Sequence, residues 1–354
     1  MELERFGYTK ELEEIRLEQG LEEFNIGRVV LEHKERYVVI TSAGEYDSEI
    51  LGHLRFTAKS RRDFPAVGDW VAFEEYDKGK GIIHAVLPRT SIIERQAVGK
   101  HGEKQIIATN INVGLIVQSI DRDFNVNRIQ RYLTVCHSAG IEPIIILNKI
   151  DLINDAELDS KINEIKRRVV EVPIIAISNE TKEGYEKFQD ILHLGKTYCL
   201  LGSSGVGKST LLNNISGVSL MKTDSISHST NKGKHVTSHR ELVLLDNGAI
   251  LIDNPGMREV GVVASEEGLD QTFDIIHNFS KECRFSDCTH IHENGCAVLE
   301  AIENDEISQE SYNNYQKLEK EKEHFDSTQL ERRKKDKELG KLIKTTLKNK
   351  KKYD

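Results

Sequence analysis

The sequence lacks any apolar run near the length of a membrane-spanning helix, which requires about 20 consecutive apolar residues. Hydrophobic residues make up 38% of the 354 positions. The first residues, MELERFGYTK, have neither the basic end nor the apolar stretch of a secretory signal peptide. Internal repeats are also absent. We therefore expect a soluble, cytoplasmic protein with no membrane partner, long enough for about three domains.

Basic residues are in the minority, with 49 lysines and arginines against 58 aspartates and glutamates and a net charge of −9. This balance argues against a general nucleic-acid binder. The distribution is uneven, however, because residues 332–354 contain 11 basic and 3 acidic residues. Basic patches on an acidic body can still dock onto phosphate backbones. The basic tail over residues 331–354 is therefore either a weak RNA-binding segment or solvated charge.

Cysteine is scarce, with five residues in the chain. Cys136 and Cys199 lie in apolar segments and are expected to be buried thiols. The other three fall close together in the last third of the chain. In a cytoplasmic protein such a group indicates a metal site rather than disulfide bonds.

The clustered cysteines occur with a histidine in the pattern Cys283-x-x-x-x-Cys288-x-His290-x-x-x-x-x-Cys296. Three thiolates and one imidazole suit a closed tetrahedral zinc site, and with no open position implied the metal is expected to be structural. His292 is the alternative to His290 as the fourth ligand. Separate reactive cysteines are the alternative to a metal.

The N-terminal part of the chain changes pattern near residue 25. Residues 1–24 form an acidic extension, with a short amphipathic helix expected over residues 9–20, capped by Thr9 and ended by Gly20. Residues 25–97 contain short β-rich runs, namely GRVVLEH, RYVVITS, EYDSEIL, DWVAFEEY, GIIHAVL and TSIIER. Five or six such strands suit a small β-barrel, and the OB-fold is the commonest nucleic-acid-binding barrel of this size.

Residues 98–268 alternate between strand and helix patterns, which is typical of an α/β domain with a parallel sheet. The expected strands are the near-continuous apolar runs VGLIVQSI, PIIIL, VPIIAIS, TYCLLG and AILID. A hairpin is expected in ELVLLDNGAILID, with its turn at Asn247-Gly248. Residues 269–330, which include the cysteine cluster, predict a small α-rich domain.

The run Gly202-Ser203-Ser204-Gly205-Val206-Gly207-Lys208-Ser209 fits the phosphate-binding pattern G-x-x-x-x-G-K-[ST] between an expected strand and an expected helix. Its amides should surround the β-phosphate, with Lys208 on the β- and γ-oxygens and the Ser209 hydroxyl on Mg²⁺. Thr210 completes the predicted nucleotide-binding set of this loop.

Asn148-Lys149-Ile150-Asp151 matches the guanine-binding motif N-K-x-D at the end of an expected strand. Asp151 can accept from N1 and the exocyclic amine of guanine, whereas adenine would leave the carboxylate unpaired. Ser178 and Asn179 form the expected second base-contacting loop. Because the guanine motif precedes the phosphate loop, the order predicts a circularly permuted GTPase domain. An ATP-dependent enzyme is poorly supported, because that interpretation gives the guanine-binding motif no role.

The sequence D-N-P-G at residues 253–256 matches D-x-x-G, with Asp253 on the Mg²⁺ side and the Gly256 amide as the γ-phosphate sensor. Between the two phosphate motifs, residues 225–240 should contain the threonine that closes on Mg²⁺ and the γ-phosphate. We select Thr237, with Ser238 and Thr230 as alternatives.

Met257 stands where many GTPases have the glutamine that orients the attacking water. A thioether cannot orient water, so either a partner completes the site or another side chain acts. His235 is the nearest candidate, and a solvent-facing histidine with no catalytic role is the equal alternative.

These motifs, in this order behind a β-rich domain, resemble the bacterial ribosome small-subunit-dependent GTPases, which act in late maturation of the small subunit. The resemblance covers about residues 25–320. It implies an OB-fold, a permuted GTPase domain and a zinc domain, with GTP hydrolysis stimulated by the small subunit. The family's switch segment reads G-R-H-T-T-T, and here residues 233–238 read G-K-H-V-T-S. The resemblance thus matches Thr237 to the central threonine and His235 to the histidine proposed to aid hydrolysis.

The resemblance also implies contact with ribosomal RNA by a protein that we expect to be a monomer. The basic loop HLRFTAKSRRDF offers the candidate contacts, and solvated charge is the alternative. We select Arg55, Lys59, Arg61 and Arg62. The leading interpretation is an enzyme whose GTP hydrolysis releases it from the small subunit. The alternative is an RNA-binding checkpoint factor in which GTP only controls docking and GTP hydrolysis is incidental.

Overall fold

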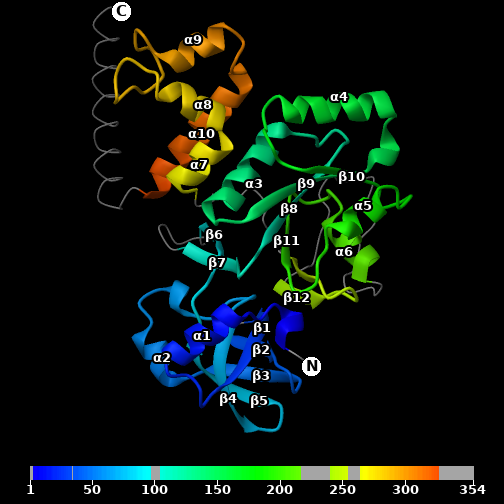
Figure 1. Cartoon of the computed structure of the whole chain (residues 1–354), viewed down its shortest axis with the longest axis vertical. Coiled ribbons are helices and arrows are strands. Elements are labelled where there is room, and N and C mark those ends of the chain that lie inside the picture. Colours follow the sequence, from blue (N-terminus) through cyan, green and yellow to red (C-terminus); the bar gives the residue numbers. More distant parts are fainter. Residues whose placement is uncertain (1–2, 34, 97–103, 217–239, 254–263, 327–354) are drawn as a thin grey trace, which may run out of the picture.

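The structure is a computed structural model that describes residues 3–33, 35–96, 104–216, 240–253 and 264–326. Three bodies follow one another along the long axis of the molecule: a β-barrel, an α/β domain and a small helical domain (Figure 1). This is the multi-domain architecture that the sequence predicts. Among the described helices, none combines the length and the apolar character that crossing a bilayer requires.

The N-terminal segment forms the 3-10 helix η1 (Leu3–Phe6) and helix α1 (Lys10–Glu18). As predicted, the Thr9 side chain caps α1 by accepting a hydrogen bond from the Leu12 amide, and Gly20 follows the helix with a φ of 66°. Phe6 and Leu12 are buried together with Trp70 of the barrel. The segment therefore covers one part of the barrel core.

The barrel consists of five strands. They are β1 (Asn25–His33), β2 (Arg36–Ile40), β3 (Glu45–Ile50), β4 (Trp70–Asp77) and β5 (Lys80–Val86). Their order is β1-β2-β3-β5-β4, and β4 pairs again with β1, which closes the barrel. Alternating apolar residues fill it, including Val39, Phe73 and Ile83. The β3–β4 connection contains α2 (Gly52–Thr57) and the 3-10 helix η2 (Arg61–Asp63).

The sixth predicted run, TSIIER, lies outside the barrel. It forms β6 (Ile92–Gln96), which pairs with β7 (Lys104–Thr109) in a separate two-stranded sheet. Ile93 and Ile107 of this sheet are buried in the core of the α/β domain. The β-propensity of this segment predicted the strand. Its position outside the barrel follows from the burial of Ile93 and Ile107 in the core of the α/β domain.

The described part of the α/β domain is built on six strands in the order β10-β9-β8-β11-β13-β12. The strands are β8 (Val113–Ser119), β9 (Glu142–Asn148), β10 (Ile174–Ile177), β11 (Thr197–Leu201), β12 (Arg240–Leu244) and β13 (Ile250–Asp253). All neighbouring pairs are parallel except β12–β13, which is the predicted hairpin. The helical elements of this domain are α3 (Val126–Ser138), η3 (Ile150–Leu152), α4 (Asp155–Lys166), α5 (Tyr185–Asp190) and α6 (Lys208–Ser216).

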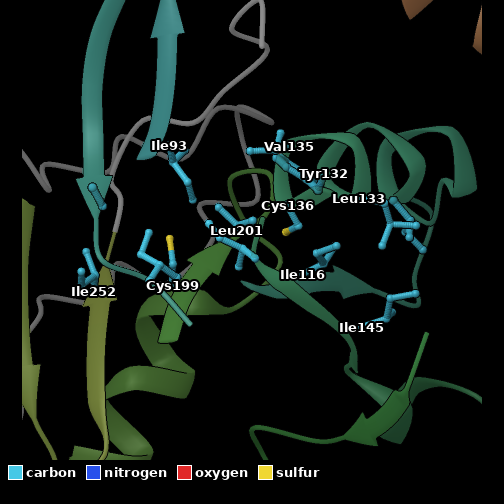
Figure 2. Close-up of a cluster of buried hydrophobic side chains, with 14 of the residues drawn as sticks. Ile93, Ile116, Tyr132, Leu133, Val135, Cys136, Ile145, Cys199, Leu201 and Ile252 are labelled. Carbon is cyan, nitrogen blue, oxygen red and sulfur yellow. The ribbon is translucent and has the colours of Figure 1, made fainter. Parts of the chain in front are cut away.

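Two apolar clusters lie on the two faces of this sheet. In one of them, Leu133 and Cys136 of α3 face Ile116 and Leu201 of the strands (Figure 2). Cys136 and Cys199 are both fully buried, as predicted. Burial on both faces explains the near-continuous apolar strands in the sequence.

Strand β12 also pairs with β1 of the barrel, so the barrel and the α/β domain share one eleven-stranded sheet. The pairing is antiparallel, with Leu31 opposite Glu241 and Glu32 opposite Arg240. No local sequence pattern predicts a strand pair between these distant segments.

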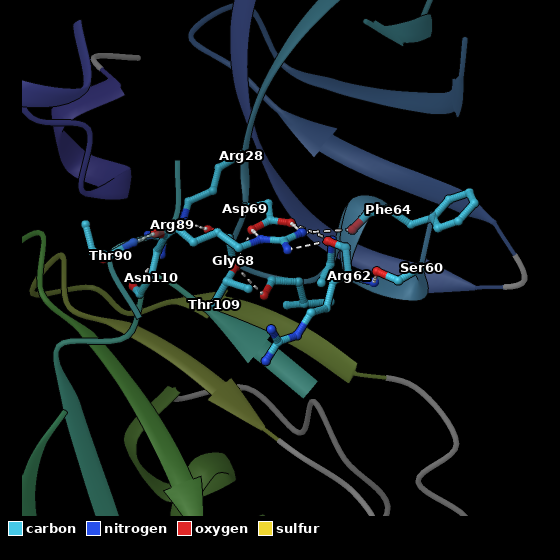
Figure 3. A network of polar contacts seen from close by, with 12 residues as sticks. Arg28, Ser60, Arg62, Phe64, Gly68, Asp69, Arg89, Thr90, Thr109 and Asn110 are labelled. Carbon is cyan, nitrogen blue, oxygen red and sulfur yellow. Dashed lines mark hydrogen bonds and ion pairs between the residues drawn. The ribbon is translucent and has the colours of Figure 1, made fainter. Parts of the chain in front are cut away.

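A buried arginine lies beside this junction (Figure 3). The Arg28 side chain is 1% exposed and donates hydrogen bonds to the carbonyls of Phe6 (2.5 Å), Gly68 (3.1 Å) and Asn110 (3.2 Å). It also donates to Oγ1 of Thr197, the first residue of β11 (2.9 Å). Burial lowers the pKa of the guanidinium to about 9, and the negative charge of a neighbouring aspartate partly opposes this shift.

That neighbouring aspartate, Asp69, is fully buried and has partners of its own. Arg89 donates to both of its carboxylate oxygens (2.8 and 2.6 Å), and the Thr109 hydroxyl donates to Oδ1 (2.6 Å). Arg89 precedes β6, and Thr109 is the last residue of β7 (Figure 3). The polar network therefore connects the barrel to the β6–β7 sheet as well as to β11.

The helical domain contains four helices, α7 (Glu266–Thr272), α8 (Asp274–Ser280), α9 (Ala297–Glu303) and α10 (Gln309–Asp326). Its own apolar core includes Leu269, Phe273, Ile276 and Val298. Helices α7 and α10 pack against α3 of the α/β domain.

Side chains connect these helices to α3. Arg131 forms a bidentate ion pair with Glu321 (2.7 and 2.8 Å). Gln130 is buried, donates to the Ser311 hydroxyl (3.1 Å) and accepts from Asn314 (2.9 Å). The helical domain is thus held on one face of α3.

Candidate nucleotide site and metal centre

The predicted phosphate loop lies between β11 and α6, where its motif requires it. Gly202 and Gly207 have φ values of 149° and 100°, a region that side chains rarely adopt. A Cβ on Gly202 would lie 2.4 Å from the Val117 carbonyl oxygen, and one on Gly207 would lie 2.2 Å from Nδ2 of Asn148. These positions need glycine because the loop passes so close to neighbouring strands and loops.

The predicted guanine-binding residues contact this loop. Asn148, at the end of β9, is buried and donates from Nδ2 to the Val206 carbonyl (2.7 Å). Its Oδ1 accepts a hydrogen bond from the backbone amide of Asn179 (3.2 Å). The side-chain Nδ2 of Asn179 donates to the Gly207 carbonyl (2.9 Å). Three segments that are distant in sequence are therefore brought together, as the motif order predicts.

The Asp151 carboxylate accepts a hydrogen bond from the Ser178 hydroxyl (2.5 Å). Both predicted base-contacting loops thus meet at the residue expected to recognise guanine. Lys149 has a left-handed backbone conformation, with a φ of 69°, which turns the chain between Asn148 and Asp151.

Asp121 is a site residue that the sequence reasoning missed. It follows β8 and accepts a hydrogen bond from Nζ of Lys149 (2.8 Å). Burial raises the pKa of the Asp121 carboxyl, but its hydrogen bonds, led by that from Lys149, outweigh burial and leave the pKa below its usual value. Its position at the end of a parallel strand is the signal that could have identified it.

Two further contacts to the site carry no motif. The Tyr185 hydroxyl donates to Oδ1 of Asn179 (2.8 Å) and accepts from Asn214 of α6 (2.8 Å). Arg128, in the first turn of α3, donates to the Ser203 hydroxyl of the phosphate loop (3.2 Å). Helices α3 and α6 are therefore both connected to the predicted nucleotide site.

The predicted phosphate and Mg²⁺ ligands lie at the same edge of the sheet. Nζ of Lys208 donates to the carbonyls of Gly202 (2.8 Å) and Ser203 (2.6 Å). Ser209 and Thr210 follow in the first turn of α6, and both are half-buried. Asp253 ends β13, which pairs with β11 directly before the phosphate loop, and it is 2% exposed.

Several predicted residues lie outside the described part of the chain. They are Thr230, His235, Thr237 and Ser238 within residues 217–239, and Gly256 and Met257 within residues 254–263. The basic tail over residues 331–354 is also outside it. These assignments stay predictions.

The predicted zinc ligands form one cluster. The ligand atoms of Cys283, Cys288, His290 and Cys296 all lie within 4.8 Å of one another. The Cys296 sulfur is 3.8 Å from that of Cys283 and 3.3 Å from Nδ1 of His290. Three sulfurs and one imidazole at this separation fit a tetrahedral zinc ion. His292 is not in the cluster, which favours His290.

The backbone around His290 brings its ring into the cluster. Its φ is 58°, and its carbonyl accepts a hydrogen bond from the Tyr312 hydroxyl of α10. Helix α10 therefore supports the metal centre and, through Glu321, also contacts α3.

The predicted RNA-contacting side chains differ in their surroundings. Arg55 forms an ion pair with Glu35 (2.8 Å), and Arg62 forms one with Glu94. Lys59 and Arg61 are exposed. Their contact with RNA stays a prediction.

Comparison with known proteins identifies the family. A family model described as RsgA GTPase matches residues 86–263. Small ribosomal subunit biogenesis GTPase RsgA 2 of Lactiplantibacillus plantarum is 42% identical over 87% of this chain and 87% of its own length. The chain belongs to the RsgA GTPase family. RsgA 1 of Listeria innocua is 41% identical over 98% of this chain and 99% of its own length. Family membership makes this protein a GTP hydrolase, as predicted.

A second family model, described as 50S ribosome-binding GTPase, matches residues 197–339. This match starts at β11 and leaves out Asn148 and Asp151. Such a start is expected where the guanine motif precedes the phosphate loop in the chain. The second match therefore agrees with the permuted order.

Two solved structures share the fold. YjeQ from Thermotoga maritima has a TM-score of 0.62 and 26% identity, covering 84% of this chain and 98% of that one. YloQ, described as a circularly permuted GTPase, has a TM-score of 0.61 and 24% identity, covering 86% and 97%. These likenesses confirm the predicted fold class of barrel, permuted GTPase domain and C-terminal Cys/His domain.

Proposed function

We propose that the protein binds the small ribosomal subunit through its ribosomal RNA and hydrolyses GTP during late maturation of that subunit. The subunit stimulates hydrolysis, and hydrolysis releases the protein. The names of its relatives support the small subunit as the partner. We further propose that the protein acts as a monomer in the cytoplasm.

The observation that carries the coupling is the pairing of β12 with β1. Strand β12 follows residues 217–239, which contain the predicted switch residues His235 and Thr237. A barrel held by RNA would therefore constrain the strand that anchors this segment. Ordering a segment near the γ-phosphate is a common route to stimulated hydrolysis.

In the proposed nucleotide site, guanine is read by Asp151, held by Ser178, with Asn148, Lys149 and Asn179 shaping the pocket. The phosphates lie on the loop over residues 202–210 and near Gly256. Mg²⁺, when bound with GTP, neutralises charge on the β- and γ-oxygens. Its proposed protein ligands are Ser209, Thr237 and Asp253.

The proposed zinc ion is structural, because four ligands close the tetrahedron. Residues 253–256 precede the helical domain in the sequence, while α3 contacts both that domain and Ser203 of the phosphate loop. We propose that both routes link the state of the nucleotide to the RNA-facing surface. The proposed domain limits are residues 1–24, 25–97, 98–268, 269–330 and 331–354.

Multiple-turnover GTP hydrolysis with and without purified small subunits tests this function. We expect slow turnover alone and strong stimulation by subunits. In His235→Ala, stimulated turnover should fall roughly a hundredfold while GTP affinity is kept. In Asp151→Asn, the binding preference should move from guanine to xanthine nucleotides. Asp155→Asn, at the exposed start of α4, is the control and should keep the preference for guanine nucleotides.

Stimulation that is absent in the parent protein would refute the proposed partner. Equal affinity of the parent for ATP and GTP would refute the proposed role of Asp151. Full stimulation of His235→Ala would mean that the ribosome itself supplies the group that Met257 cannot provide. A parent that binds subunits with GTP but never turns over would instead support the checkpoint alternative.

A further inference from the structure

Two aromatic side chains of the barrel are strongly exposed, and their surroundings differ. Phe56, in α2, is 91% exposed, and Tyr76, at the end of β4, is 57% exposed. Tyr76 is surrounded in sequence by Glu74, Glu75 and Asp77. Phe56 lies instead in the basic β3–β4 connection. A phenylalanine this exposed contributes almost none of the stabilisation that its burial would give the barrel core. Phe56 therefore needs an explanation beyond folding.

The segment that carries Phe56 is held firmly on the barrel. Leu54 and Phe64, on either side of it, pack against the barrel core. The Ser60 hydroxyl accepts from the Arg62 amide, and Asp63 accepts from the amides of Lys59 (2.7 Å) and Ser60 (2.9 Å). These contacts fix the backbone on both sides of the exposed ring. A partner that meets Phe56 thus meets a pre-formed surface.

The charge around Phe56 is positive. Residues 52–62 contain His53, Arg55, Lys59, Arg61 and Arg62 and no acidic residue. The carboxylate of Asp63, the first acidic residue after them, is directed at backbone amides. Arg55 and Arg62 form ion pairs with glutamates, whereas Lys59 and Arg61 are exposed and lie within five residues of Phe56 in the chain. An aromatic face with neighbouring lysine and arginine suits a partner with flat apolar rings and negative linkers.

We propose that Phe56 is a stacking platform for an unpaired RNA base, with Lys59 and Arg61 holding the adjacent phosphates. Single-stranded RNA exposes the faces of its bases, whereas a duplex hides them. This inference rests on the proposed function, because it names the element of ribosomal RNA that the barrel binds. Tyr76 lacks this role because its acidic neighbours repel phosphate.

The test measures binding of the full-length protein to a short oligoadenylate, to the same strand in an RNA duplex and to small subunits. Phe56→Ala should lower affinity for the single strand roughly five- to a hundredfold, because one stacked base is lost. Phe56→Trp should bind at least as tightly as the parent, and Phe56→Leu should bind like Phe56→Ala. Tyr76→Ala is the matched control and should bind like the parent.

The phosphate contacts have a separate readout. Changing Lys59 and Arg61 together to glutamine should reduce the slope of log affinity against log salt by about 0.7 for each lost contact, whereas Phe56→Ala should leave that slope unchanged. Unchanged thermal unfolding of both variants would confirm that the surface alone was altered.

Three outcomes would overturn the stacking role. The first is a parent that does not bind the oligoadenylate, and the second is a Phe56→Ala variant that binds it as tightly as the parent. The third is loss of subunit binding by Phe56→Ala with unchanged RNA binding, since the partner would then be a protein. Each is distinct from failure of the proposed function, which appears as a parent that subunits neither bind nor stimulate.

Discussion

The barrel and the helical domain join the GTPase domain in different ways. The barrel is connected by backbone hydrogen bonds between β1 and β12 and by the buried Arg28. The helical domain is connected by side chains of α7 and α10 on one face of α3. Moving the barrel would break the β1–β12 pairing and remove the hydrogen-bond acceptors of the buried Arg28. Moving the helical domain would break only contacts made by side chains. The barrel is thus the better sensor for the predicted switch segment.

The largest expected effect concerns the helical domain itself. Cys288→Ala should abolish the proposed zinc binding and unfold this domain, because structural zinc contributes on the order of 10 kcal/mol or more to small zinc domains. GTP affinity should be unchanged, since the nucleotide residues belong to another domain. Elemental analysis and hydrogen exchange over residues 264–326 measure the result.

Cys199→Ala, which removes a buried thiol outside the cluster, is the control and should keep the metal. Zinc retained in Cys288→Ala would remove Cys288 from the ligand set. Weakened GTP binding in that variant would show that the two domains are coupled more tightly than their side-chain junction indicates.

The next effect concerns the barrel junction. Arg28→Met should lower the free energy of unfolding by about 3 kcal/mol, because three buried carbonyls each lose a hydrogen bond and only that of Gly68 keeps another, from Asn110. Urea unfolding followed by tryptophan fluorescence suits this test, since Trp70 is the single tryptophan and its ring lies 5.5 Å from the guanidinium of Arg28.

Arg16→Met is the matched control, because Arg16 also donates to three backbone carbonyls, but within a local loop and with its side chain 20% exposed. The free energy of unfolding of Arg16→Met should fall by about 1 kcal/mol. Equal losses in the two variants would show that burial at the junction adds nothing to the Arg28 contacts.

A smaller effect is expected where α7 meets α3. Gly268→Ala should destabilise by about 2 kcal/mol, since its Cβ would lie 2.0 Å from Oγ and 2.7 Å from the amide nitrogen of Ser138. The substitution would otherwise favour the helix. Gly52→Ala in α2, where a Cβ meets no atom within 4 Å, is the control and should be neutral or slightly stabilising. Thermal unfolding distinguishes the two, and a neutral Gly268→Ala would mean that this junction can shift.

The smallest effect is expected for the ion pair between α3 and α10. A double-mutant cycle of Arg131→Ala and Glu321→Ala should give a coupling energy of about 1 kcal/mol or less, because both side chains are partly exposed. Chemical unfolding of the four proteins provides the measurement. A coupling energy as large as the Arg28 effect would contradict the contrast between the two junctions.

Local patterns in the sequence were enough to predict the fold class and most of the candidate site. The phosphate loop, the guanine motif and the cysteine spacing are chemical patterns with local requirements, so their order predicted a permuted GTPase with a zinc domain. The apolar runs predicted the strands because alternation and burial leave a local record. The closeness of Asn148, Asn179 and Gly207 was also predictable, because each lies at or after the end of a parallel strand and such strands end at one edge of a sheet.

The way in which the domains are joined became visible in the folded structure alone. The pairing of β1 with β12, the position of β6 outside the barrel and the burial of Arg28 all depend on segments that are distant in the chain. An arginine in a strand is ordinarily expected at the surface, and a phenylalanine such as Phe56 is ordinarily expected inside. Local pattern cannot specify these exceptions, because the acceptors of Arg28 come from four distant segments and the exposure of Phe56 depends on how the β3–β4 connection packs on the barrel.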